Sequence, residues 1–190
     1  MSWSKIKTLR SLLKSSTIND GNRTLLESVL VPEVAEALEE WINNSRSNGV
    51  LIGGLALSFY VKPRTTQDID ILFLTPGDIP TKVLGFKRTR KGAFQHNKTH
   101  AEIEVVVPAT INISEQLAQK IFATAIEHDG IKIASPAGIV ATKLGRSIIR
   151  DEADIVDLIK TKRVTDLNSF NLSTKLMSKF AKLEQRAKHE

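Results

Sequence analysis

Two aspartates and a pair of glycines give the clearest chemical signal in this sequence. Asp68 and Asp70 alternate with apolar residues in the segment 67–73 (QDIDILF). Because side chains alternate along a strand, we expect both carboxylates on one side, where they repel each other. Such oxygen ligands suit Mg²⁺. Upstream, an apolar run ends in Gly53 and Gly54, whose backbone N–H groups at a helix start can hold a phosphate. Together the two features indicate phosphoryl or nucleotidyl transfer.

A metal site of this kind needs a third carboxylate from a neighbouring strand. The segment 101–107 (AEIEVVV) alternates, so Glu102 and Glu104 share one face of an expected strand. If this strand lies beside the Asp68–Asp70 strand, one glutamate completes a trio of the type used in two-metal nucleotidyl transfer. We favour Glu104, which has apolar neighbours on both sides, and keep Glu102 as the alternative. An isolated D-x-D also occurs at ordinary strand edges, where the acids face water or pair with lysines.

The composition favours a polyanionic partner. The chain has 190 residues, a formal net charge of +6 and a pI of about 9.6, which is consistent with nucleic acid but also with a mildly basic protein. It has no cysteine, which excludes disulfides and thiolate chemistry. No apolar run approaches the roughly 20 residues that cross a membrane, so we expect no membrane partner. The absence of cysteine fits a reducing cytoplasm, where we expect the protein to lie.

The elements that must position these residues are mixed helices and strands. We expect an α+β fold, a small mixed sheet flanked by helices, because the regular spacing of a doubly wound sheet is missing. The expected units are N-terminal helices (1–47), a core (48–135) and a helical C-terminal region packed on that core (136–190). Expected strands lie at 50–52, 64–73, 101–107 and 131–134. Expected helices lie at 4–15, 23–44 with a break near Pro32, 78–84, 114–126, 135–150, 151–160 and in the basic tail 165–190.

Two basic segments have both a functional and an ordinary interpretation. Residues 86–100 contain five Lys or Arg, two His and no acid, and we interpret them as a hairpin around Lys91 and Gly92. Its cations could contact nucleic-acid phosphates, or they could simply face solvent. His96 and His100 are four residues apart outside a helical pattern, so we do not expect a zinc site. The basic tail could bind tRNA, or pack its apolar positions on the core.

The spacing resembles that of the nucleotidyltransferase superfamily, which includes DNA polymerase beta. The resemblance rests on Gly53-Gly54, thirteen further residues, Asp68-x-Asp70 and a later acid in an apolar strand. The longer string with Arg64-x-Thr66 before Asp68 is similar to the nucleotidyltransferase-like toxins of bacterial abortive-infection and toxin–antitoxin systems. Three later elements also match that pattern: Ser135-Pro136-Ala137-Gly138, Lys143-Leu144 and Asp154-x-x-Asp157.

The resemblance implies a fold, a cofactor and a set of roles. It implies a nucleotidyltransferase fold with the site at one edge of the sheet, and it implies Mg²⁺ and an NTP. Gly53 and Gly54 would hold the phosphates, while Asp68, Asp70 and Glu104 would bind the metal.

Four further residues are expected nucleotide contacts. Arg64 and Thr66 would share the face of the aspartates, although a salt bridge at the strand entry is the ordinary alternative. Lys143 would reach a triphosphate oxygen, although a surface lysine is the alternative. Relatives often place a serine next to the glycines. Leu55 and Ala56 stand there in this chain, so Ser58 is the remaining hydroxyl.

These features together predict a nucleotidyltransferase that moves NMP from an NTP to a hydroxyl acceptor. We expect RNA as the acceptor, with tRNA favoured, and a toxin–antitoxin setting would add an antitoxin protein as partner. One alternative is a catalytically weak nucleotide- or RNA-binding protein of the same fold. Another is a small-molecule adenylyltransferase, against which the lack of an obvious acidic aminoglycoside-binding segment weighs.

Overall fold

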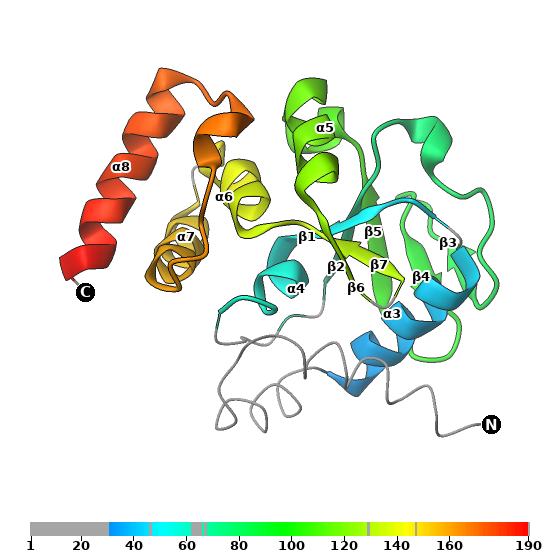
Figure 1. Cartoon of the computed structure of the whole chain (residues 1–190). Coiled ribbons are helices and arrows are strands. Elements are labelled where there is room, and N and C mark those ends of the chain that lie inside the picture. The colour runs from blue at the N-terminus through cyan, green and yellow to red at the C-terminus, as the bar shows by residue number, and fades with distance from the viewer. Residues whose placement is uncertain are drawn as a thin grey trace.

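The computed structural model describes residues 31–45, 47–61, 66, 68–128, 130–146 and 148–189, which form a mixed sheet with helices around it (Figure 1). Within these residues, seven strands form one sheet in the order β3-β4-β5-β2-β1-β7-β6. β2 is parallel to β5 and β1 is parallel to β7, and the other neighbours are antiparallel. The strands are β1 (Val50–Ile52), β2 (Ile69–Leu72), β3 (Phe86–Arg88), β4 (Phe94–His96), β5 (Glu102–Val106), β6 (Ile126–His128) and β7 (Ile131–Ile133).

The helices lie around this sheet, and the last three are grouped at its end beyond α5 (Figure 1). The α-helices are α3 (Pro32–Ser45), α4 (Gly53–Leu57), α5 (Glu115–Thr124), α6 (Pro136–Leu144), α7 (Ile149–Lys160) and α8 (Thr174–His189). Short 3-10 helices occupy Pro76–Asp78, Pro108–Ile111 and Leu167–Phe170. None of the helices in the described part of the chain is long and apolar enough to cross a membrane.

The α+β interpretation is confirmed, because one mixed sheet of short strands is flanked by helices. β1 is buried along its whole length, as expected for a short apolar strand in the middle of a sheet. In β2, Ile69, Ile71 and Leu72 are buried while Asp70 is half-buried, so the strand carries a carboxylate within an otherwise apolar surface. β5 lies beside β2, as the expected site requires.

Capping residues determine where several of the helices begin. Ser114 caps α5 by accepting a hydrogen bond from the backbone N–H of Leu117 at 3.2 Å. Ser135 caps α6 in the same way, accepting from the N–H of Gly138 at 3.2 Å, with Pro136 at the first helical position. The helix expected to break near Pro32 is α3, which begins at that proline.

Other expectations were wrong in their boundaries. The helix expected over 135–150 ends at Leu144, and α7 begins at Ile149, because the chain turns at Gly145. The helix expected over 78–84 is only the 3-10 turn Pro76–Asp78. The sequence did not predict a strand at β6 (Ile126–His128). The helix expected over 4–15 and the part of the expected helix 23–44 before residue 31 lie outside the described residues.

Candidate active site

The candidate site lies where β1, β2 and β5 run side by side in the sheet. Asp70 on β2 lies opposite Ile52 of β1 and opposite Glu104 of β5. Residues that face each other across paired strands have their side chains on the same face. Asp68 is exposed just before β2 begins, and its charge acts on Asp70. The structure therefore places Asp68 and Glu104 close enough to Asp70 for their charges to act on it.

Gly53 lies against the Asp70 carboxylate. It follows Ile52, the β1 residue opposite Asp70, and has a φ of +73°, a conformation that residues with a Cβ adopt at a cost. A Cβ at this position would overlap Oδ2 of Asp70. The glycine is thus required both by the backbone turn from β1 into α4 and by the space that the carboxylate occupies.

Negative charge accumulates at Asp70. The pKa of Asp70 is raised to about 6, mainly by burial and then by the nearby charges of Glu104 and Asp68, against the lowering effect of Arg146 and Lys143. A carboxylate with two acidic neighbours in a partly desolvated place favours a cation. The donor set, carboxylate oxygens alone, is of the kind that Mg²⁺ prefers. As they stand, no three acidic or histidine side chains among the described residues are arranged so that they could hold a metal ion.

The structure distinguishes the two candidate third acids. Glu104 faces Asp70 across the parallel β2–β5 pair, whereas Glu102 faces Gln95 of β4 on the other side of β5. Glu104 also contributes to the raised pKa of Asp70. Both glutamates are exposed. Position therefore favours Glu104 over Glu102 as the partner of Asp70.

Lys143 and Ser58 do not have the surroundings expected of nucleotide contacts. Lys143 is 3% exposed, and its Nζ donates to Asp151 Oδ1 at 2.8 Å and Asp154 Oδ2 at 2.7 Å. Its ammonium charge is therefore already compensated inside the protein. Ser58 is 4% exposed, and its hydroxyl donates to the carbonyl of Leu55 at 2.6 Å. The expectation that either side chain is presented to a ligand does not hold in this arrangement.

Arg146 is not among the expected nucleotide contacts, and the structure places it against Asp151 of α7. Its Nε and Nη2 donate to the two carboxylate oxygens of Asp151 at 2.8 and 2.9 Å, a bidentate pair. Burial alone would raise the pKa of Asp151, but hydrogen bonds from Arg146 and Lys143 outweigh it and hold the pKa below its usual value. The Arg146 side chain is 47% exposed and lies close enough to Asp70 to lower its pKa. The sequence feature that could have indicated this position is Gly145, because a glycine there ends α6 just before Arg146.

The remaining expected contact residues lie before β2. Thr66 is half-buried in an irregular segment, so it does not belong to the strand as expected. Arg64 lies outside the described residues.

The basic hairpin is confirmed, with β3 and β4 antiparallel around Lys91 and Gly92. His96 is buried, and its ring nitrogens lie 2.9 Å from Glu40 Oε2 on α3 and 2.8 Å from the Thr99 hydroxyl. This histidine therefore fixes the hairpin to α3. Lys87, Arg90 and Lys91 are exposed on the hairpin.

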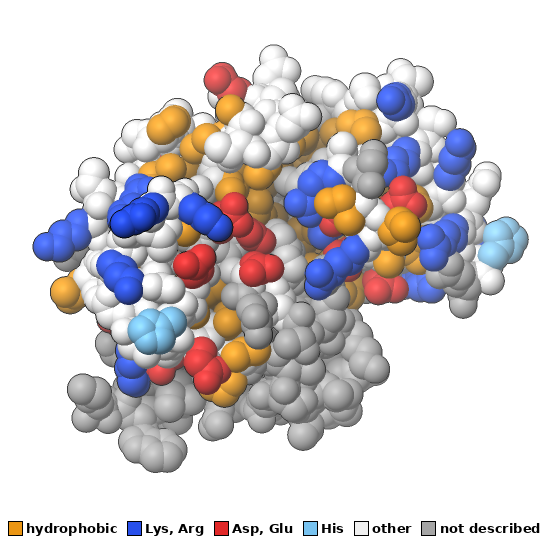
Figure 2. Space-filling view, turned by 180° about the vertical axis from the view of Figure 1, so that it is seen from behind, with side chains coloured by type: hydrophobic (Ala, Val, Ile, Leu, Met, Phe, Trp, Pro, Cys, Tyr) orange, Lys and Arg blue, Asp and Glu red, His pale blue; other side chains and the backbone are white. Residues whose placement is uncertain are grey.

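Figure 2 shows how charge is distributed on the face seen from behind. Acidic side chains gather near the middle of this face, beside a hollow, and Lys and Arg side chains lie on both sides of them. One side corresponds to the β3–β4 edge and the other to the end with α6, α7 and α8.

Comparison with known proteins gives a family. No curated protein matched the chain. The family model described as "nucleotidyltransferase of unknown function (DUF6036)" matches residues 30–189, which include every strand of the sheet and all three carboxylates of the candidate site. The chain therefore belongs to this family of nucleotidyltransferases of unknown function.

Proposed function

We propose that the protein is a Mg²⁺-dependent nucleotidyltransferase that transfers NMP from an NTP to a hydroxyl group of RNA, with tRNA as the favoured acceptor. The observation that carries the proposal is the alignment of Asp70 with Glu104 across β2 and β5, with Gly53 against the Asp70 carboxylate. Membership of the nucleotidyltransferase family supports the reaction class.

The carboxylates have the main role in this proposal. Asp68, Asp70 and Glu104 would hold Mg²⁺, which when bound lowers the pKa of the attacking hydroxyl and neutralises charge on the triphosphate. The acceptor oxygen forms a bond to the α-phosphorus as the bond to pyrophosphate breaks, and the hydroxyl proton passes to one of the carboxylates. Gly53 and Gly54 border the place where the phosphates would lie.

Arg146 is the phosphate-binding cation that the geometry supports in place of Lys143. Its guanidinium is half-exposed, lies within electrostatic reach of Asp70, and is fixed by two hydrogen bonds to Asp151. Those bonds use Nε and Nη2, and a guanidinium has five N–H donors, so the same group can also bind an anionic oxygen. Lys143 supports this arrangement indirectly, because it compensates the buried Asp151 and Asp154.

The distribution of basic side chains supports RNA as the acceptor. Cations lie on both sides of the acidic centre (Figure 2), and Lys87, Arg90 and Lys91 are exposed on the β3–β4 hairpin. A polyanion that crosses the site would contact both groups, whereas a small hydroxyl substrate would need neither.

A label-transfer assay tests this function. The full chain is incubated with Mg²⁺, each α-labelled NTP in turn and total RNA, and labelled RNA is measured with released pyrophosphate. We expect transfer with the wild type and its loss in Asp70→Asn. Asp78→Asn is the matched control, because Asp78 is an exposed acid whose carboxylate accepts hydrogen bonds from Thr75 within its own turn. Transfer that is equal in Asp70→Asn and the wild type would refute the proposal.

One observation favours a second candidate, a nucleotide- or RNA-binding protein without turnover. No three acidic or histidine side chains of the described residues are arranged to hold a metal as they stand. The same assay separates the two, since the second candidate requires that NTP binds and no label is transferred to any acceptor.

The toxin setting and an antitoxin partner rest on the sequence resemblance alone. Expression of the chain with and without the adjoining reading frame tests them. Growth arrest that the second protein relieves would support this setting, and growth unaffected in both cases would refute it.

A further inference from the structure

A straight row of four cations runs along α8. Lys175, Lys179, Lys182 and Arg186 follow one another at intervals of four, three and four residues. At 3.6 residues per turn these positions fall within about 60° of arc, and at 1.5 Å per residue they span about 16 Å. We call this set the α8 row. Glu184 is the one acidic residue of the helix as the structure describes it, and it lies on another side.

The apolar face of α8 is packed against the protein itself. Phe180 and Leu183 are buried, and Leu176 and Ala187 are half-buried, so α8 packs this face on the rest of the C-terminal helices. An amphipathic basic helix that inserts into a lipid surface needs its apolar face for that purpose. The packing of α8 therefore favours a soluble polyanion over a membrane as the partner of the row.

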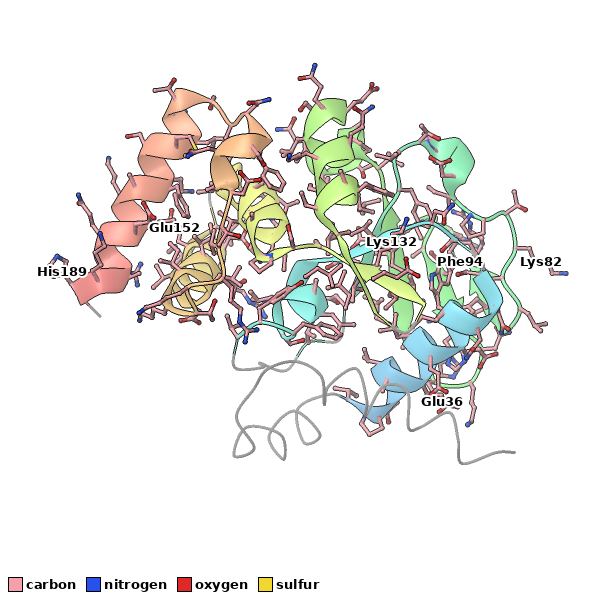
Figure 3. All side chains as sticks on the ribbon, in the orientation of Figure 1. Glu36, Lys82, Phe94, Lys132, Glu152 and His189 are labelled. Carbon is pink, nitrogen blue, oxygen red and sulfur yellow. The ribbon has the colours of Figure 1, made fainter. Side chains whose placement is uncertain are left out.

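The α8 row is joined to the candidate site. The Nζ of Lys179 donates to the backbone carbonyl of Arg146 at 3.1 Å and pairs with Glu152 of α7 at 3.1 Å. Glu152 lies between α7 and α8 in Figure 3. Arg146 in turn lies within electrostatic reach of Asp70. Cations thus continue from the edge of the acidic centre onto the surface of α8.

We propose that the α8 row is a track for the phosphate backbone, which holds the RNA acceptor while its reacting hydroxyl lies at Asp70. The inference rests on the proposed function, and it adds where the acceptor binds. Neighbouring cations of the row lie about 4.5–6 Å apart along the helix axis, so successive side chains can contact successive phosphates of one strand. Lys179 anchors the row to the α6–α7 turn, and Lys175, Lys182 and Arg186 are its exposed members.

The test is RNA binding as a function of salt, measured on the full chain by fluorescence anisotropy with a labelled 20-nucleotide oligouridylate and no NTP. The test variant is Lys175→Gln/Lys182→Gln. The control is Lys82→Gln/Lys188→Gln, which removes the same charge. Lys188 is on the side of α8 away from the row, and Lys82 lies at the opposite end of the molecule from α8 (Figure 3). All four lysines are exposed, so both variants should fold like the wild type.

We expect the test variant to bind about 5- to 20-fold more weakly at 0.1 M salt. Its slope of log K against log salt should be smaller by about 1.4, which is about 0.7 for each of two phosphate contacts on a single strand. The control should change affinity less than about twofold.

The proposal would be refuted if the two double variants lost RNA affinity equally, or if the test variant kept the wild-type slope of log K against log salt. Absence of RNA binding by the wild type would also refute it. Binding to phosphatidylserine vesicles that depends on Lys175 and Lys182, without RNA binding, would also overturn it. Because no NTP is present, these results are independent of turnover. Failure of the proposed function would appear instead as RNA binding through the α8 row without label transfer.

Discussion

Asp70 on β2 and Glu104 on β5 face each other at one register position of a parallel strand pair. Like charges in this position repel each other, and this repulsion adds to burial in raising the pKa of Asp70 to about 6. The pair is therefore unfavourable for the fold by itself. A site with this property is typical of residues kept for function at some expense of stability.

Glu104→Gln separates the functional from the structural effect of this pair. We expect transfer to fall on the order of 100-fold, because one ligand of the metal is lost. The metal-free protein should gain about 0.2–1 kcal/mol in free energy of unfolding at neutral pH, since one repulsion is removed. The pKa of Asp70, followed by carboxyl ¹³C NMR, should decrease. Glu102→Gln is the matched control on the same strand. Equal effects of the two substitutions on transfer would contradict the assignment.

Gly53→Ala should damage the site through its backbone. An alanine at a φ of +73° costs about 1–2 kcal/mol, and its Cβ would displace the Asp70 carboxylate. We expect loss of both transfer and thermal stability. Gly77→Ala is the control, because the nearest atom to a Cβ there is 3.6 Å away and its φ is ordinary. A Gly53→Ala protein with wild-type transfer would contradict this prediction, because it would show that the Asp70 carboxylate functions with a Cβ at position 53.

Lys143→Met should be mainly a stability defect. Removing the ammonium leaves the buried carboxylates of Asp151 and Asp154 without their shared partner, which costs about 3–5 kcal/mol. Urea unfolding measures this. Lys98→Met, which breaks the pair between the exposed Lys98 and Glu36, should leave the free energy of unfolding nearly unchanged. A Lys143→Met protein with wild-type stability but weak NTP binding would instead restore the expected triphosphate role.

Asp151 predicts the behaviour of the protein in acid. Because its pKa is lowered in the folded state, the stability that it contributes is fully present above its ordinary value of 3.8. That stability is lost as pH falls below this value through the folded-state pKa. In Asp151→Asn, the free energy of unfolding should therefore depend less steeply on pH in this range. Asp157→Asn, an exposed change on the same helix, should keep the wild-type steepness. The same steepness in all three proteins would refute the prediction.

Much of the candidate site could be predicted because its signals are local. The alternation around Asp68 and Asp70 and around Glu104 indicated strands, and Ser114 and Ser135 indicated helix starts, all within a few residues. The choice between Glu102 and Glu104 needed the sheet, since only the register shows which glutamate faces Asp70.

The surroundings of Lys143 could not be predicted in the same way. Its apolar neighbours indicated an inner surface, and it is buried, but its partners Asp151 and Asp154 come from the next helix. These two aspartates reach Lys143 because the chain turns after Leu144 and begins a new helix at Ile149. The sequence pattern predicted a single helix to residue 150. The hairpin shows the same limit, since the contact of His96 with Glu40 joins residues 56 positions apart.

Manganese binding tests the central claim most directly, namely that Asp68, Asp70 and Glu104 together hold a divalent metal with an NTP. Free Mn²⁺ is measured by electron paramagnetic resonance during titration of the protein with a non-hydrolysable NTP analogue. We expect a Mn²⁺ site in the wild type and in Glu102→Gln, and at least about tenfold weaker binding in Asp70→Asn and Glu104→Gln. Equally tight Mn²⁺ binding in Asp70→Asn and the wild type, or no Mn²⁺ binding by the wild type, would contradict it.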